Sequence, residues 1–463
     1  MAHRPGLILS AFVMGAGHHA ASWRHPAAPD EAAELTPAHY VDLVRIAERG
    51  KFHAFFLADT LAFSPNVALN GVSNLEPLVT LAALSQHTER IGLVATISTA
   101  FYPPYHLARL INTLDHFSGG RFGWNVVTST SDHEARNFGS ARLAEHDDRY
   151  RAAAELVDAV DHLLHSWEPG AVVRDRASGR YLDQDRVATE PSRIGRFTFG
   201  GPLDLPRSPQ GRPVIVQAGR SPAGIEFAGR YAEVVFTVQQ TFQEAKSFRD
   251  ALRGAARDAG RSPGDVRVLP GLWPFIGSTE AEARKLYDEL EELVLPAQVA
   301  RQIATFTGLD LSGYGYDEIL PALPATGFQG QQGRYQTLRD LIDSGRNTLR
   351  KLQEQFGTSR GHQVVIGTPE QIADSIIDWH DRGAVDGFSI QPPILPHGLA
   401  QFVDHVVPEL QRHKVFHDDY LPGARTFRDQ LGASRRDRSP ESADPVRRSV
   451  PDEPVGAHRS GSS

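Results

Sequence analysis

Cysteine is absent from the 463 residues of this chain, and methionine occurs only twice. The absence of cysteine excludes disulfides, thiolate metal ligands and a cysteine nucleophile, and it fits a protein of the cytoplasm. No run approaches the roughly 18 apolar residues that a membrane-spanning helix needs. The formal net charge of −8 gives no reason to expect nucleic acid as a partner. No H-E-x-x-H metal motif, Ser/His/Asp grouping or carboxylate pair stands out, so no metal site is predicted.

The most informative segment that is present runs from Arg90 to Ser129. An apolar, β-branched stretch ends in small hydroxyl residues, and a helix-like segment closed by Ser-Gly-Gly follows it. A second buried-type strand then ends in hydroxyl residues again. Strand, helix, glycine turn and strand form a βαβ unit, which implies parallel strands. The polar groups collect at the carboxyl ends of the strands, where α/β barrels place their chemistry.

Eight strand-like runs alternate with helical patterns along the chain, and a last helix is predicted over Leu399–Arg412. The runs are Leu7–Val13, Ala54–Ala58, Ile91–Ile97, Phe122–Val127, Val214–Ala218, Glu233–Val238, Val266–Phe275 and Gly387–Gln391. This alternation predicts a (β/α)₈ barrel of the TIM type, an α/β fold. A doubly wound sheet is the alternative, but the G-x-G-x-x-G turn typical of its dinucleotide sites is missing. The first run resembles a signal peptide in its apolar character, yet it is short, and we interpret it as the first strand.

Two insertions interrupt the repeat, at residues 166–212 and 294–365. Long segments of this kind in compact domains are usually functional or disordered, and we expect both to act as lids over the barrel mouth. From residue 433 to residue 463 the chain is rich in Arg, Ser, Pro and Asp, which predicts a disordered tail. Residues 1–432 are therefore predicted to form one barrel domain.

Three candidate binding residues lie at strand ends. Asp59 can accept hydrogen bonds from a ligand or can cap the following helix. Thr96 offers a small hydroxyl at the end of the third run, although strand threonines are common without any ligand. Asn125 lies deep in an apolar strand, where its amide needs partners that are either structural or provided by a ligand.

Four further residues suit a phosphate group. Gly219 lets the backbone approach a ligand closely, and Ser221 precedes a helix whose free N–H groups can donate to phosphate oxygens. His146 and Tyr150 are four residues apart, on one face at the start of a helix. The alternative is that Tyr150 is a core aromatic side chain.

Two histidines, His18 and His19, follow the first strand and are candidate acid–base residues. The alternative is that they are loop histidines that hold Trp23 or Arg24 in place.

Several short motifs match those of one family and occur in the same order along the chain, over roughly residues 6 to 425. They are Gly17-His18-His19, Phe55-Phe56-Leu57-Ala58-Asp59, Gly123-Trp124-Asn125-Val126-Val127-Thr128-Ser129, His146-Asp147-Asp148-Arg149-Tyr150, Arg207-Ser208-Pro209-Gln210-Gly211 and PVIVQAGRS at 213–221. In these motifs the chain resembles the bacterial luciferase-like flavin monooxygenases. Within that family it is similar to the branch that contains the nitrilotriacetate, dibenzothiophene-sulfone and long-chain alkane monooxygenases.

The resemblance implies a two-component monooxygenase that uses reduced FMN and dioxygen on a small organic substrate. It also implies a separate NAD(P)H:flavin reductase and a homodimer or homotetramer. It places Asp59, Thr96, Asn125, His146, Tyr150, Gly219 and Ser221 in the flavin site, and His18 or His19 near the reacting part of the flavin. The rival hypotheses are a deazaflavin (F420)-dependent oxidoreductase with the same barrel and a flavin-binding barrel without catalytic activity.

Overall fold

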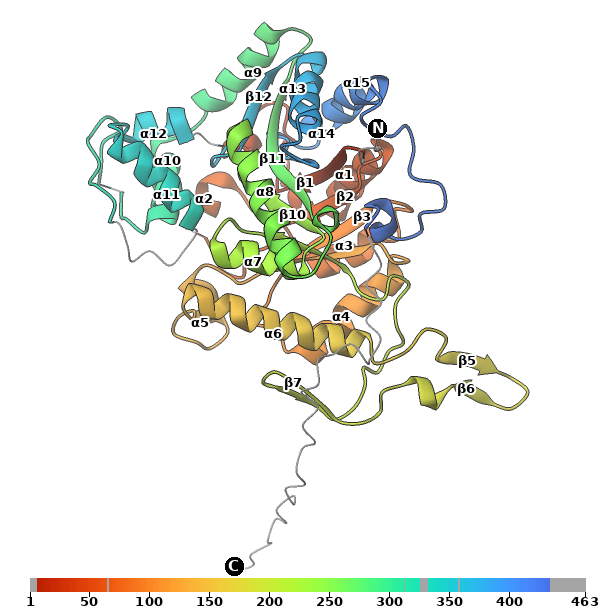
Figure 1. Cartoon of the computed structure of the whole chain (residues 1–463). Helices are drawn as coiled ribbons and strands as arrows, with labels where there is room; N and C mark the ends of the chain where they lie inside the picture. Colours follow the sequence, from red (N-terminus) through yellow and green to blue (C-terminus); the bar gives the residue numbers. More distant parts are fainter. Residues whose placement is uncertain (1–5, 65, 312, 325–331, 357–358, 434–463) are drawn as a thin grey trace, which may run out of the picture.

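The computed structural model describes residues 6–64, 66–311, 313–324, 332–356 and 359–433. Its core is a closed barrel of parallel strands wrapped by helices (Figure 1). The strand order closes on itself because β10 pairs with β11 and β1 pairs with β13. The predicted fold, a (β/α)₈ barrel, is confirmed.

All eight predicted strands form the barrel, with bounds within one or two residues of the predicted ones. They are β1 (Ile8–Val13), β2 (Ala54–Leu57), β3 (Gly92–Ser98), β4 (Phe122–Val127), β9 (Val214–Ala218), β10 (Val234–Thr237), β11 (Arg267–Ile276) and β13 (Gly387–Ile390). Every residue of β1, β2 and β3 is buried, as expected for parallel strands covered on both faces.

All but one of the helices that cover the barrel begin with a side-chain cap or with proline in the first turn, and α6 is the exception. They are α1 (Pro37–Arg49), α3 (Pro77–Leu84), α4 (Pro104–Phe117), α6 (His146–Leu164), α7 (Pro222–Tyr231), α8 (Phe242–Asp258), α9 (Glu280–Glu292) and α13 (Pro369–Asp381). The helix predicted over 399–412 is instead α14 (His397–Gln401), a π-helical turn (Phe402–Val406) and α15 (Val407–Arg412). Pro408 explains this difference, because proline provides no N–H group for a regular helical hydrogen bond.

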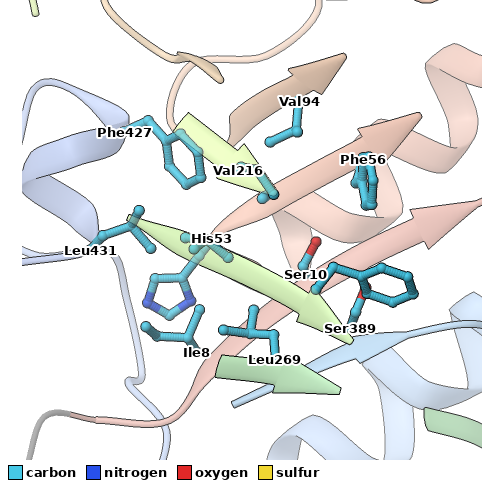
Figure 2. Close-up of a pocket in the computed structure, with 13 residues that line it drawn as sticks. Ile8, Ser10, His53, Phe56, Val94, Val216, Leu269, Ser389, Phe427 and Leu431 are labelled. Carbon is cyan, nitrogen blue, oxygen red and sulfur yellow. The ribbon is translucent and has the colours of Figure 1, made fainter. Parts of the chain in front are cut away.

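The barrel interior is closed at the amino-terminal ends of the strands by α16 (Phe427–Gln430), which was not predicted from the sequence. The Phe427 ring is buried inside the barrel, and a Cβ atom added at Gly92 would lie 2.5 Å from that ring. A Cβ at Gly123 would lie 3.1 Å from it, so two strand glycines make room for one aromatic side chain. Figure 2 shows the small, mostly apolar cavity beside the Phe427 ring, with Ser10, His53 and Ser389 as its polar lining.

A buried ionic cluster holds α16 against the barrel. Glu233 accepts hydrogen bonds from Arg212 at 2.5 Å and from Arg428 at 2.7 Å, and all three side chains are buried. Burial alone would raise the pKa of Glu233, but the two guanidinium groups outweigh it and lower that pKa to about 2.

The first insertion contains two short hairpins, β5 (Val172–Asp175) with β6 (Arg180–Leu182) and β7 (Ser192–Ile194) with β8 (Phe197–Phe199). Figure 1 shows the first hairpin projecting away from the barrel. The segment bonds to the outside of α4 and α6, for example through Asn112 to the Pro206 carbonyl at 3.0 Å and His162 to Ser192 at 2.8 Å. These two contacts are with the outer helices, and the role of the insertion as a lid stays a prediction.

The second insertion forms three helices with a hydrophobic core of their own. They are α10 (Pro296–Thr307), α11 (Gln332–Asp343) and α12 (Leu349–Phe356), packed around Ile303, Phe306, Leu338 and Leu352. Gln298 of α10 donates to the carbonyls of Ala20 and Leu69 at 3.1 and 3.2 Å. Because these residues follow β1 and β2, the insertion lies against loops at the carboxyl ends of the strands, where the mouth is.

The insertion was predicted to end at residue 365, but it runs into a ninth strand. This strand, β12 (Gln363–Gly367), pairs in parallel with the second half of β11 and lies outside the closed barrel. Other elements also escaped prediction, among them the short helices α2 (Val67–Asn70) and α5 (Asp132–Asn137) and the covering helix α9. Within the described ranges no helix is long and apolar enough to cross a membrane. The predicted disordered tail, apart from Ala433, falls outside the described residues.

Candidate active site

The barrel mouth is floored by three aromatic side chains that point inward from the ends of β1, β2 and β10. The rings of Phe12 and Phe56 stack with centroids 4.5 Å apart, and Phe236 meets Phe12 edge-on at 5.3 Å. Phe56 and Phe236 also line the interior cavity, whose other residues belong largely to the amino-terminal halves of the strands. The aromatic layer therefore separates that cavity from the mouth above it.

On the neighbouring strands β3 and β4, Thr96 and Asn125 lie side by side in the strand register. Asn125 donates its amide N–H to the Thr96 hydroxyl at 2.9 Å, and both side chains are buried. The Asn125 carbonyl oxygen is buried without a hydrogen-bond partner. Since buried polar atoms are usually paired, this oxygen is suited to accept a hydrogen bond from a ligand N–H.

The four predicted phosphate residues come together where β9 meets α7. Ser221 is the N-cap of α7 and accepts the Gly224 N–H at 3.1 Å. The Tyr150 hydroxyl bonds to Ser221 and Gln217, which partly offsets the rise in its pKa that burial causes. The His146 ring lies 5.1 Å from the Tyr150 ring.

Two glycines keep this corner open. A Cβ at Gly219 would lie 2.6 Å from the Gln217 amide nitrogen and 2.8 Å from the Tyr150 hydroxyl. A Cβ at Gly224 would lie 3.0 Å from the same hydroxyl. Backbone without side chains, two hydroxyls and a helix N-terminus form a cradle that fits a phosphate group. Gln217, which sequence reasoning missed, belongs to this cradle, and its Oε1 is buried without a partner.

Asp59 follows β2 and is half-buried at the mouth. Its carboxylate accepts the Thr60 N–H at 2.8 Å. Burial, helped by the charges of Glu76 and Glu134, raises the pKa of Asp59 to about 6. The hydrogen bond from Thr60 opposes this rise. The carboxyl group is therefore mostly ionised at pH 7 and exchanges its proton near pH 6.

The loop after β1 holds His18 and His19 by backbone contacts with the loop after β13. Their N–H groups donate to the carbonyls of Pro392 and Pro393 at 3.0 and 3.2 Å. A Cβ at Gly17 would lie only 2.2 Å from the Pro393 oxygen, so the close approach of the two loops requires glycine there. This explains why Gly17 precedes the two histidines.

The two histidines have different surroundings. His18 Nε2 lies 2.9 Å from the Phe12 carbonyl, and the ring packs edge-on against Phe12. Burial and nearby Arg360 lower the pKa of His18 to about 3, so the imidazole is neutral at pH 7 and donates Nε2–H to that carbonyl. His19 accepts the Ala21 N–H on Nδ1 at 3.2 Å, and its Nε2 lies 3.4 Å from Glu291 on α9. His19 thus joins the loop to α9.

Three more polar residues reach the mouth that sequence reasoning did not select. His362 precedes β12, and its ring lies 5.5 Å from Phe236; Gln391 follows β13 and accepts the Trp273 indole N–H at 2.6 Å. Arg360 lies 3.8 Å from the Met14 sulfur, just beyond β1. Gln391 follows the rule that selected Thr96, polar side chains at strand ends, whereas His362 and Arg360 lie in an insertion that no motif marks.

Comparison with known proteins decides the family. Residues 15–386 match the family described as luciferase-like monooxygenase. The chain belongs to this family. The predicted resemblance is thereby confirmed.

Similar proteins of known activity cover nearly the whole chain. It is 40% identical over 92% of its length to N-acetyl-S-(2-succino)cysteine monooxygenase of Bacillus subtilis, matching 96% of that protein. It is 41% identical over 90% of its length to nitrilotriacetate monooxygenase component A of Aminobacter aminovorans, matching 94%. Dibenzothiophene-sulfone monooxygenase of Rhodococcus erythropolis is 38% identical, with 90% of this chain and 93% of that one covered.

Among solved structures, a riboflavin lyase determined with a modified FMN and riboflavin superposes with a TM-score of 0.84. It is 30% identical and covers 93% of this chain and 96% of its own. The sequence relatives are monooxygenases, which confirms the prediction of an oxygenating, flavin-dependent enzyme. The deazaflavin-dependent proteins share only the fold, at 14% identity for one of them with a TM-score of 0.51.

Proposed function

We propose that this luciferase-like monooxygenase is the oxygenase of a two-component system. It would take reduced FMN from a separate NAD(P)H:flavin reductase and use dioxygen to oxygenate a small organic substrate. The observation that carries the proposal is the cradle of Tyr150, Gly219, Ser221 and Gly224, in which any side chain at the glycines would meet the Tyr150 hydroxyl. The name of one relative, component A of a monooxygenase, supports the two-component part.

Each part of the mouth has a role in this proposal. Tyr150 and Ser221 would donate to the phosphate, with His146 beside them. Thr96 and Asn125 would hydrogen-bond to the edge of the flavin ring, and Asp59 would accept from it or exchange a proton. Bound reduced FMN supplies the electrons with which dioxygen is activated. The ring trio of Phe12, Phe56 and Phe236 would exclude water from the reacting atoms.

Neutral His18 is the proposed acid–base residue closest to the substrate side of the mouth. Its Nε2–H is engaged by the Phe12 carbonyl, so the proton that it handles would be taken up and released at Nδ1. His19, tied to Glu291 and Ala21, would hold the loop in place. A homodimer or homotetramer, as the family resemblance implies, remains part of the proposal.

The test uses purified protein and photoreduced FMN. We expect reduced FMN to bind more tightly than oxidised FMN, and mixing with air-saturated buffer to consume oxygen. NADH should be oxidised only after a flavin reductase is added, because no dinucleotide motif is present. Rapid NADH oxidation by the chain alone would contradict the proposal. Hydride transfer from a reduced deazaflavin without oxygen uptake would favour the rival oxidoreductase.

A further inference from the structure

Two arginines from the second insertion lie close enough for their charges to interact. Arg334 lies in the first turn of α11, and Arg360 lies four residues after α12. The two guanidinium charges repel each other. Besides burial, both charges lower the pKa of His362, and the charge of Arg360 also lowers the pKa of His18. His362 contacts Phe236, and Arg360 contacts Met14, so the pair lies over the aromatic floor.

Among the described residues no carboxylate forms an ion pair with Arg334 or Arg360. The guanidinium carbon of Arg334 lies 4.7 Å from the centre of the Phe306 ring. The Arg360 guanidinium contacts the Met14 sulfur. Burial together with the other arginine lowers the pKa of Arg334 to about 9, so both side chains remain cationic at pH 7.

The placement is unfavourable without a ligand. A cation in the first turn of a helix faces the positive end of the helix dipole, which favours anions instead. Arg360 has a left-handed backbone, with φ of 56°, which is unfavourable for a residue with a side chain. Two adjacent cations in a partly buried site are stabilised by an anion that carries at least two charges.

The flavin phosphate is not that anion in the proposed arrangement. Its cradle lies at Tyr150 and Ser221, and the charge that acts on Tyr150 there is that of Arg149, not of Arg334 or Arg360. Guanidinium groups match carboxylates through paired N–H donors, and the pair is next to His18 rather than next to α7.

We propose that Arg334 and Arg360 form the substrate subsite of this enzyme and that they select an organic acid with two or more carboxylates. The inference rests on the proposed function, because it assigns the substrate class of that same mouth. Neutral substrates of similar size would leave two cations unpaired and would bind weakly.

The experiment measures binding rather than turnover. The full chain, with and without oxidised FMN, is titrated calorimetrically with nitrilotriacetate, N-acetyl-S-(2-succino)cysteine, the trimethyl ester of nitrilotriacetate and dibenzothiophene sulfone. The variants are Arg334→Met and Arg360→Met. The control is Arg346→Met, an exposed arginine in the same insertion that contacts Ser344.

We expect at least one of the two acids to bind more tightly than the ester and the sulfone. Each mouth variant should weaken acid binding roughly tenfold or more, since a hydrogen bond to a charged group is lost. Arg346→Met should bind the acids as the unaltered protein does, and no variant should change FMN affinity.

Three results would overturn the inference. The first is that neither acid binds. The second is that the neutral compounds bind as tightly as the acids and are unaffected by the variants. The third is that Arg334→Met and Arg360→Met weaken FMN but not riboflavin, which would assign the arginines to the flavin phosphate. None of these results depends on oxygen uptake by reduced FMN, so failure here is distinguishable from failure of the proposed oxygenase function.

Discussion

The assignment of the flavin phosphate site depends on the Tyr150 hydroxyl. Replacing Tyr150 with Phe and Ser221 with Ala removes two donors from the cradle while leaving the glycines in place. A lost hydrogen bond to a charged group costs about 1.5–3 kcal/mol, so FMN affinity should fall roughly tenfold or more for each change. Riboflavin, which lacks the phosphate, should lose much less.

Fluorescence titration with both flavins makes this comparison. Tyr105→Phe is the matched control, because the Tyr105 hydroxyl donates to the Pro202 carbonyl at 3.4 Å on the outside of α4. An equal loss for FMN and riboflavin in the double variant would reject the phosphate assignment.

The two neighbouring histidines should behave differently when each is replaced by Asn. His18 faces Arg360 and packs on Phe12, whereas His19 contacts Glu291 on α9. His18→Asn should release more hydrogen peroxide per reduced FMN when a converted substrate is present, because proton handling near the reacting atoms is lost. His19→Asn should keep the ratio of product to peroxide and lower the melting temperature instead. If both variants stay fully coupled, neither histidine takes part in the chemistry.

The Asp59 carboxyl group should make stability depend on pH in a defined window. Its pKa is about 6 in the folded chain against 3.8 for the ordinary group, so the folded state binds more protons between these values. Stability contributed by the protonated form is therefore lost as pH rises from about 4 to about 6. Asp59→Asn cannot ionise, so its melting temperature relative to the unaltered protein should rise across this window and stay level above it. A constant difference from pH 4 to pH 7 would contradict the shifted pKa.

At the scale of elements, the short helix α16 contributes more to stability than its length suggests. The Phe427 ring fills the space left by Gly92 and Gly123 inside the barrel. Phe427→Ala should cost about 3–5 kcal/mol of unfolding free energy, because a buried aromatic ring is lost and a cavity stays behind. Phe117→Ala, at a side chain that is 60% exposed, is the control and should change stability little. Chemical denaturation of both variants measures the difference.

The sequence was sufficient to predict the barrel elements because each strand is a buried run of β-branched and aromatic residues between helix signals. The cradle was also predictable, since glycine before a serine N-cap and a proline is a local pattern. Arg334, Arg360 and His362 were not, because only the packing of the insertion brings them to the mouth. The strand β12 was missed for a similar reason, since its pairing with β11 extends beyond the eight-strand repeat.

Glu233 connects parts of the chain that are distant in sequence and so stabilises the whole barrel. It pairs with Arg212 before β9 and with Arg428 on α16. Glu233→Gln leaves the buried Arg428 guanidinium without its counter-charge and Arg212 with the more distant Asp161, at 3.9 Å, and should cost about 3–5 kcal/mol. Asp250→Asn, which breaks the exposed pair with Lys246, should cost about 1 kcal/mol or less.

The same carboxylate sets the acid limit of the fold. Its pKa is about 2 in the folded chain and 4.5 ordinarily, so the stability it contributes is complete above about 4.5 and is lost as pH falls toward 2. Thermal unfolding between pH 3 and pH 7 should therefore show a smaller gap between Glu233→Gln and the unaltered protein at the acid end. A gap that does not change with pH would contradict this role.

The closure of the barrel by the two ends of the chain also decides when the protein is complete during its synthesis. Strand β1 is made first but pairs with β13, and the interior is sealed only by Phe427, near the last described residues. A nascent chain that has reached residue 380 holds seven strands in a ring with an open seam, and apolar side chains such as Ile8 and Val94 are uncovered. Contacts between segments so distant in sequence form slowly, and exposed strand edges invite aggregation in the meantime. Strand β1 therefore stays without one neighbour until residues 387–390 have been made, and the open seam is exposed throughout that interval.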